Sequence, residues 1–174
     1  MNATILRLLN KIPVAFCCLL VLVMGTLVGG ALYELLVIDP LWSAHPPESV
    51  RTWNVNPLFV IKPAAFWSQM GFLLSLSPIA ALATNWRMPQ RRKWLLITAA
   101  CAAICIAISF IYFIPAITRL LEKRGDGLSD IEIKSSVRLL AALNWFKFGL
   151  LFTGWIASLR ALAIASPGDL FASG

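Results

Sequence analysis

The sequence predicts an all-α integral membrane protein, a four-helix bundle with up-down-up-down topology and both termini on the cytoplasmic side. The 174-residue chain is 59% hydrophobic and only 13% charged, whereas soluble domains are nearer a quarter charged. Its mean hydropathy is +0.80. The apolar residues also fall into four runs, each long enough to cross a bilayer, at 12–38, 63–84, 94–118 and 136–163.

These runs use most of the chain, so residues 1–174 are expected to form a single transmembrane domain. Basic residues precede the first run and crowd the 85–93 loop, whereas the 39–62 and 119–135 loops have nearly balanced charge. The positive-inside rule therefore places the 85–93 loop in the cytoplasm and the other two loops on the exported side. We expect the bacterial inner membrane or an equivalent membrane, and the net charge of +7 gives no indication of nucleic-acid binding.

The first run, 12–38, is too long for the apolar region of a signal peptide, so a true membrane span is expected. It contains Gly25-x-x-x-Gly29, a spacing of small residues that lets another helix approach closely. Such a motif predicts helix packing and gives no information on chemistry.

The exported end of this run carries Tyr33 and Glu34, and Glu34 is the only acidic residue inside the four runs. Asp39-Pro40 is predicted to end the helix. The prolines of the 39–62 loop predict an ordered loop with turns and one short helix starting near Ser49.

Trp42 in the same loop suits either the headgroup region, where amphipathic rings anchor, or a lid over the bundle. His45 is the sole histidine in the sequence and does not supply the multi-histidine shell of common metal sites. Two interpretations of His45 stay open: a mixed site with Glu34, Asp39 or Glu48, and a solvent-facing loop residue.

The second and third runs carry few polar residues, and these lie toward the exported side. Trp67 and Gln69 lie in the exported third of 63–84, and Tyr112 lies near the exported end of 94–118. In the loop that follows, Ser129-Asp130-Ile131-Glu132 matches a helix-capping box and predicts an amphipathic extension of the last span.

The last run, 136–163, carries Arg138, Asn144 and Lys147 among apolar residues. A charge at the centre of a spanning helix costs about 2.5–3.5 kcal/mol on insertion scales unless it faces a partner, water or the surface. Helical periodicity places one set of residues on a common face, which is expected to point into the bundle: Asn144, Lys147, Leu151, Gly154 and Ser158. Trp145 lies elsewhere on the helix.

The polar residues of the spans thus gather in the exported half of the bilayer. We predict a Glu34–Lys147 pair, direct or through a shared water, with Asn144 and Tyr112 nearby. This intramembrane charge pair could simply lock the bundle, with Arg138 reaching to headgroups. Alternatively, it could line a cavity and move protons.

The sequence lacks a phosphate-binding Gly-rich loop, a Cys-x-x-Cys pair, a paired-histidine helix and a Ser-His-Asp set. No metal and no cofactor are therefore predicted. Cys17, Cys18, Cys101 and Cys105 fall in the cytoplasmic half of the spans and predict no disulfide framework.

With these features, the chain resembles the anthrone-oxygenase-like family of small four-helix membrane proteins. The resemblance depends on the Gly-rich first span, the Tyr33-Glu34…Pro40 exit, Tyr112-x-x-Pro115 and the last helix with Asn144-Trp145. It implies cofactor-independent oxygenation of a planar phenolic or anthrone-type substrate, whose own carbanion reacts with oxygen. Such a reaction needs a base and an oxyanion stabiliser, roles that Glu34 and Lys147 could fill.

The leading hypothesis is therefore a membrane-embedded enzyme for a small hydrophobic substrate, an oxidoreductase of the monooxygenase type. The expected catalytic residues are Glu34, Lys147, Asn144 and Tyr112. The expected substrate-binding residues are Tyr33, Gln69, Arg138, Trp67, Trp145, Trp42 and His45. The expected partners are membrane lipid and a small hydrophobic ligand.

Two other functions are left open by the same sequence. One is a non-catalytic membrane subunit or assembly factor, held in a homo-oligomer or to a membrane partner through Gly25/Gly29 or Gly154/Ser158. The other is a small oligomeric transporter, which the lack of internal repetition disfavours.

Overall fold

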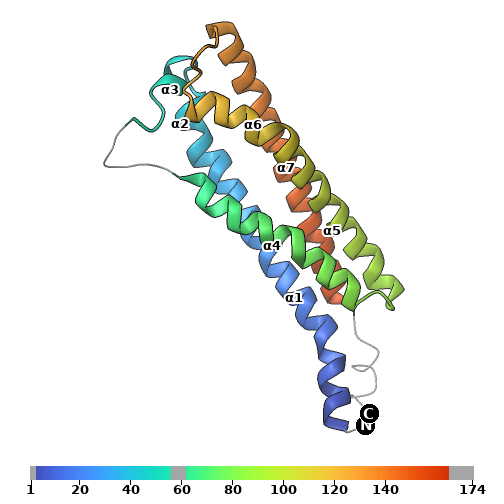
Figure 1. Cartoon of the computed structure of the whole chain (residues 1–174). Coiled ribbons are helices and arrows are strands. Elements are labelled where there is room, and N and C mark those ends of the chain that lie inside the picture. Colours follow the sequence, from blue (N-terminus) through green and yellow to red (C-terminus); the bar gives the residue numbers. More distant parts are fainter. Residues whose placement is uncertain (1–2, 56–61, 165–174) are drawn as a thin grey trace.

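The chain forms long helices that are separated by short connections (Figure 1). The computed structural model describes residues 3–55 and 62–164, and every regular element within these ranges is a helix. Four helical segments of this described part are long and apolar enough to cross a membrane: Lys11–Ser43, Pro63–Thr84, Pro89–Glu122 and Asp130–Ala163. The predicted all-α class with four potential spans is confirmed.

The first span is longer than predicted, because the helix does not end at Asp39-Pro40. It consists of α1 (Ala3–Tyr33), a wider π-helical segment η1 (Glu34–Ile38) and α2 (Asp39–Ser43). Proline lacks an N–H and is tolerated in the first turn of a helix, and α2 begins with Asp39-Pro40. After α2, the short helix α3 (Glu48–Arg51) lies where one was predicted near Ser49.

The second span, α4 (Pro63–Thr84), has the bounds that the sequence predicted. The third span comprises α5 (Pro89–Ile108), η2 (Ser109–Phe113), α6 (Ile114–Ile117) and η3 (Thr118–Glu122). It therefore extends past both predicted limits, 94 and 118. Its start lies within the basic loop because Pro89 can begin a helix there.

The last span, α7 (Asp130–Ala163), begins at the predicted capping box. The Ser129 side chain accepts a hydrogen bond from the Glu132 N–H at 3.3 Å, and the Glu132 carboxylate accepts one from the Ser129 N–H at 2.8 Å. The helix thus starts at Asp130 rather than at Ser136, and most of the expected 119–135 loop is helical.

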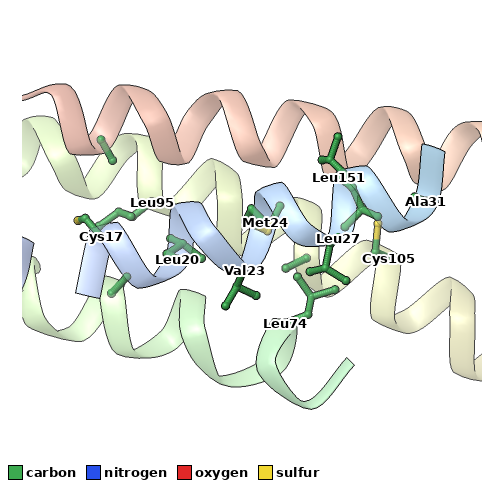
Figure 2. Packing of buried hydrophobic residues seen from close by; sticks show 14 residues of the cluster. Cys17, Leu20, Val23, Met24, Leu27, Ala31, Leu74, Leu95, Cys105 and Leu151 are labelled. Atoms are coloured by element: carbon green, nitrogen blue, oxygen red, sulfur yellow. The ribbon is translucent and has the colours of Figure 1, made fainter. Parts of the chain in front are cut away.

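The four spans pack in a ring, in which α1 and α5 each contact both α4 and α7. Figure 2 shows the core between them, in which Leu20, Met24 and Leu27 of α1 lie among Leu74 of α4, Leu95 of α5 and Leu151 of α7. Aliphatic residues and buried cysteines fill this core, so Cys17 and Cys105 act as apolar filler.

A second apolar cluster lies where α2, α3, α6, η3 and the start of α7 meet, which we call the α2–α3 end (Figure 1). The buried members of this cluster are Trp42, Val50, Phe113, Leu120, Leu121, Ile133, Val137 and Leu140. An ion pair of 2.7 Å between Arg51 and Asp130 joins α3 to α7 on its exposed side. The described parts of the two loops expected on the exported side therefore form a packed cap.

Small residues allow the closest helix contacts. A Cβ on Gly154 would lie 2.8 Å from Cε of Met24 and 3.4 Å from Cβ of Cys101, so α1, α5 and α7 converge at this point. Gly154 and Ser158 are buried within the chain, on the face that helical periodicity predicted to point into the bundle. Gly25 packs on the Trp155 ring, whereas Gly29 is exposed with nothing within 4 Å of an added Cβ.

Candidate polar site near the α2–α3 end

Lys147 lies near the middle of α7, on the face that packs into the bundle. Its Nζ lies 3.8 Å from the centroid of the Phe113 ring. This cation–π contact offsets part of the free-energy cost of placing a charge in an apolar environment. The Cys105 thiol of α5 donates to the Lys147 carbonyl over 3.6 Å. The prediction that Lys147 points toward other helices, and not toward lipid, is confirmed.

Asp39 and Asn144 form the closest polar contact of the site. Asn144 Nδ2 donates to Asp39 Oδ2 at 2.8 Å and so joins α2 to α7. Both side chains are buried, with 5% of Asp39 and 7% of Asn144 exposed. The other carboxylate oxygen, Asp39 Oδ1, is also buried and has no hydrogen-bond partner, and the Trp42 side chain is a polar neighbour of this carboxyl group.

Glu34 and Asp39 lie on the same side of the first span, because one wide turn of π-helix, η1, connects them. The Asp39 N–H bonds to the Glu34 carbonyl, closing a turn that is one residue wider than an α-helical turn. The side chain of Glu34 is half-buried and interacts electrostatically with Asp39 and Lys147. Trp67 of α4 is its polar neighbour.

The predicted direct pair between Glu34 and Lys147 is not formed. Both residues are described, and no ion pair joins them. Lys147 instead interacts at longer range with both carboxyl groups, Glu34 and Asp39. The ammonium group lies over the Phe113 ring. The alternative form of the prediction, with a shared water, stays a prediction.

The structure brings together four residues, which we call the polar cluster: Glu34, Asp39, Asn144 and Lys147. Tyr112 is not part of it, because 42% of its surface is exposed and the adjacent Phe113 faces Lys147 instead. Neighbouring residues of a helix point in different directions, so the ring that meets the lysine is one position away from the predicted one.

The predicted substrate-binding residues divide into two groups. Trp67 and Trp42 lie beside the two carboxyl groups. Trp42 is only 1% exposed, so the headgroup anchor, one of the two interpretations left open for it, is wrong. The side chains that are exposed and lie outside the polar cluster are Tyr33, Gln69, Arg138, Trp145 and His45.

Gln69 instead lines a shallow, open depression on the surface of α4. The depression has a volume of about 450 Å³ and is lined by Ser68, Gln69, Met70, Phe72 and Leu73. It lies on the helix that also carries Trp67, the neighbour of Glu34.

No group of three or more His, Cys, Asp or Glu residues that could hold a metal ion occurs among the described residues. The mixed site around His45 is not assembled, because His45 is exposed whereas Asp39 is buried.

A second polar group lies at the opposite end of the bundle and was not predicted from the sequence. Arg91 is 2% exposed and donates to Asn85 Oδ1 at 3.2 Å and, through Nε, to the Ile164 carbonyl at 3.0 Å. Asn85 Nδ2 donates to the Pro13 carbonyl at 3.0 Å. These bonds join α1, α4, α5 and the end of α7, and each of the side-chain donor nitrogens of Arg91 and Asn85 has an acceptor.

Comparisons with protein-family models, with curated proteins and with solved structures give no match to this chain. The functional interpretation therefore depends on the polar cluster itself.

Proposed function

We propose that this chain is a multi-pass membrane enzyme that acts on a small hydrophobic, phenolic or anthrone-like molecule by cofactor-independent oxygenation. The observation that supports it is the polar cluster: two carboxyl groups, an amide and a lysine meet inside a bundle whose core is mainly apolar. Ionisable groups are rare inside membrane spans and commonly mark functional sites.

The proposed orientation follows from the distribution of charge. The 85–93 loop is rich in arginine and lies in the cytoplasm together with both termini, so the topology is up-down-up-down. The α2–α3 end, with the polar cluster, then lies toward the exported side. The host membrane is the bacterial inner membrane or an equivalent one.

The residues of the cluster take distinct roles in this proposal. A carboxylate, Glu34 or Asp39, removes a proton from the activated CH₂ group of the substrate. The Lys147 ammonium group stabilises the negative charge that develops on the substrate oxygen. Asn144 is a positioning residue, because it holds Asp39 through its hydrogen bond.

The oxidant is dioxygen. The substrate carbanion forms a C–O bond with dioxygen, and the resulting peroxide anion takes up a proton from the cluster. Loss of water then breaks the O–O bond and the second C–H bond, leaving a ketone. In sum, CH₂ and O₂ give C=O and H₂O, so the carbon is oxidised by four electrons and dioxygen is reduced by four.

The test uses the full chain in lipid nanodiscs with anthrone as the probe, and it measures oxygen consumption and anthraquinone formation against empty nanodiscs. Lys147→Met and Glu34→Gln are expected to lower kcat by about 10²–10⁴-fold, the usual contribution of acid–base groups. Phe146→Leu is the matched control, since Phe146 is 54% exposed and lies beside Lys147 in the sequence. It is expected to keep the wild-type rate.

Two results would contradict this proposal. If the wild-type chain oxidises anthrone no faster than empty nanodiscs, the enzyme is contradicted and a non-catalytic subunit or assembly factor is favoured, whose partner helix would fit Gly29, where the first span is exposed and open. If Lys147→Met keeps the full rate while losing thermal stability, the polar cluster is a structural lock and not the catalytic site. An oligomeric transporter has no specific structural observation in its favour.

A further inference from the structure

The π-helical segment η1 changes which residues of the first span share a face. In a regular α-helix, residues five positions apart differ by about 140° around the axis. In η1 the Asp39 N–H bonds to the Glu34 carbonyl, so Asp39 lies one wide turn after Glu34. As a result, the two carboxyl groups lie within electrostatic range of each other and of the same lysine.

The charges of this cluster do not balance. Two carboxylates and one ammonium group give a net charge of −1. The other elements packed around them contribute no balancing charge: α4 supplies Trp67, η2 supplies Phe113, and α5 supplies Cys105, whose S–H is bound to a carbonyl. Asn144 of α7 is neutral. An uncompensated charge in such a place is costly, and it is removed most simply by one bound proton.

The Asp39 carboxyl group supplies an independent observation. Only 5% of Asp39 is exposed. Its Oδ2 accepts a hydrogen bond from Asn144, and its Oδ1 has no hydrogen-bond partner. A buried carboxylate oxygen without a donor is unfavourable. A proton between this carboxyl group and that of Glu34 would turn one of the two into a donor for the other.

We propose that Glu34 and Asp39 share one bound proton, so that each chain carries a single protonated carboxyl pair opposite Lys147. Two like charges held close together commonly behave in this way, with the proton belonging to the pair and not to one residue. This proton site involves the same cluster as the proposed oxygenation and extends it, but it is present without any substrate.

The experiment is infrared spectroscopy of the full chain in a detergent that has no ester carbonyl, at neutral pH and without substrate. The carbonyl stretching band of a protonated carboxylic acid is separate from the bands of a carboxylate and shifts in D₂O. The wild-type chain is expected to show this band at an intensity of one group per chain. Glu34→Gln and Asp39→Asn are each expected to abolish it completely, because the remaining carboxylate then balances Lys147.

Lys147→Met is expected to double the band, since both carboxyl groups then become neutral, whereas Lys147→Arg keeps the charge and is expected to keep one group per chain. Glu48→Gln and Asp126→Asn, which change exposed carboxylates, are the controls and leave the band unchanged. If Lys147→Met does not fold, the two shape-conserving variants, Glu34→Gln and Asp39→Asn, still test the shared proton.

Three results would overturn the shared proton. The band could be absent from the wild-type chain, or it could persist in one of the two single variants, which would assign the proton to one residue. It could also disappear when sodium is added at constant pH, which would make the site a sodium site. Failure of anthrone oxidation alone leaves this proposal standing, because the infrared measurement contains no substrate.

Discussion

Lys147 shows how a single charged residue is accommodated in a spanning helix. Its ammonium group contacts the Phe113 ring, and two carboxyl groups lie within electrostatic range. A cation–π contact of this kind contributes about 0.5–2 kcal/mol, depending on how far it is removed from water. This is of the same order as the insertion cost of a central lysine, so the ring and the carboxyl groups together make the charge tolerable.

The inward direction of Asn144 and Lys147 could be predicted from helical periodicity, because α7 is regular along this stretch. The partner of Asn144 could not be predicted in the same way. Asp39 precedes a proline, and the sequence therefore indicated the end of a helix. The π-helical turn that continues the helix and turns Asp39 inward has no periodic signal of its own.

Arg91 gives a prediction at the same scale. In Arg91→Met the Asn85 side-chain oxygen and the Ile164 carbonyl lose their donor, and each hydrogen bond to a charged group contributes about 1.5–3 kcal/mol. We expect a loss of free energy of unfolding of at least this size, measured by denaturant titration in mixed micelles. The sequence predicts only a basic 85–93 loop that includes Arg91, because nothing in the residue pattern indicates that this side chain is buried.

Lys93→Met is the matched control for that measurement. It removes the same charge from the same helix, but Lys93 is exposed and has only a cation–π contact with Trp94, at 5.4 Å. A change below about 1 kcal/mol is expected for an exposed contact of this kind. Equal stability of the two variants would show that the Arg91 hydrogen bonds do not hold the helices together.

At the scale of elements, small residues decide how closely the helices approach. Gly25 and Gly154 were both predicted as packing positions, and both have neighbours that a side chain would meet. Gly29, from the same motif, has none. The motif identifies small residues in the sequence, but it does not show which of them faces a helix of the same chain.

Gly154→Leu is therefore expected to destabilise the bundle by about 1–3 kcal/mol through overpacking against Met24 and Cys101. Gly29→Leu makes the same change where the space is open and is expected to leave the free energy of unfolding within about 1 kcal/mol of wild type or to raise it, since leucine favours a helix more than glycine does. Thermal unfolding in detergent measures both. A larger loss for Gly29→Leu than for Gly154→Leu would contradict the packing described above.

Two helix starts have a local signal in the sequence, and the ends of the second and fourth spans also lie where they were predicted. The capping box at Ser129–Glu132 and the proline at position 63 are local signals, and α7 and α4 begin where these signals lie. The first and third spans continue beyond their predicted ends through π-helical segments. Their continuation depends on packing in the α2–α3 end, where Trp42, Leu120 and Ile133 are buried together.

At the scale of the whole molecule, polar contacts near both ends flank an apolar middle. Arg91 and Asn85 join the helices at one end, and the polar cluster joins α2 to α7 toward the other. Between them lies the core shown in Figure 2. The two ends differ in one physical respect: the Arg91 donors are matched to acceptors, whereas the polar cluster keeps an unpaired carboxylate oxygen.

Solid-state NMR of the full chain in lipid bilayers tests the polar cluster most directly. With ¹⁵N-labelled lysine and ¹³C-labelled phenylalanine, aspartate and glutamate, a through-space signal is expected between a lysine Nζ and phenylalanine ring carbons, with weaker signals to carboxyl carbons. These signals should disappear in Lys147→Met and remain in Lys93→Met. A Lys147 Nζ that shows contacts only to lipid would contradict the presence of a charged site inside this bundle.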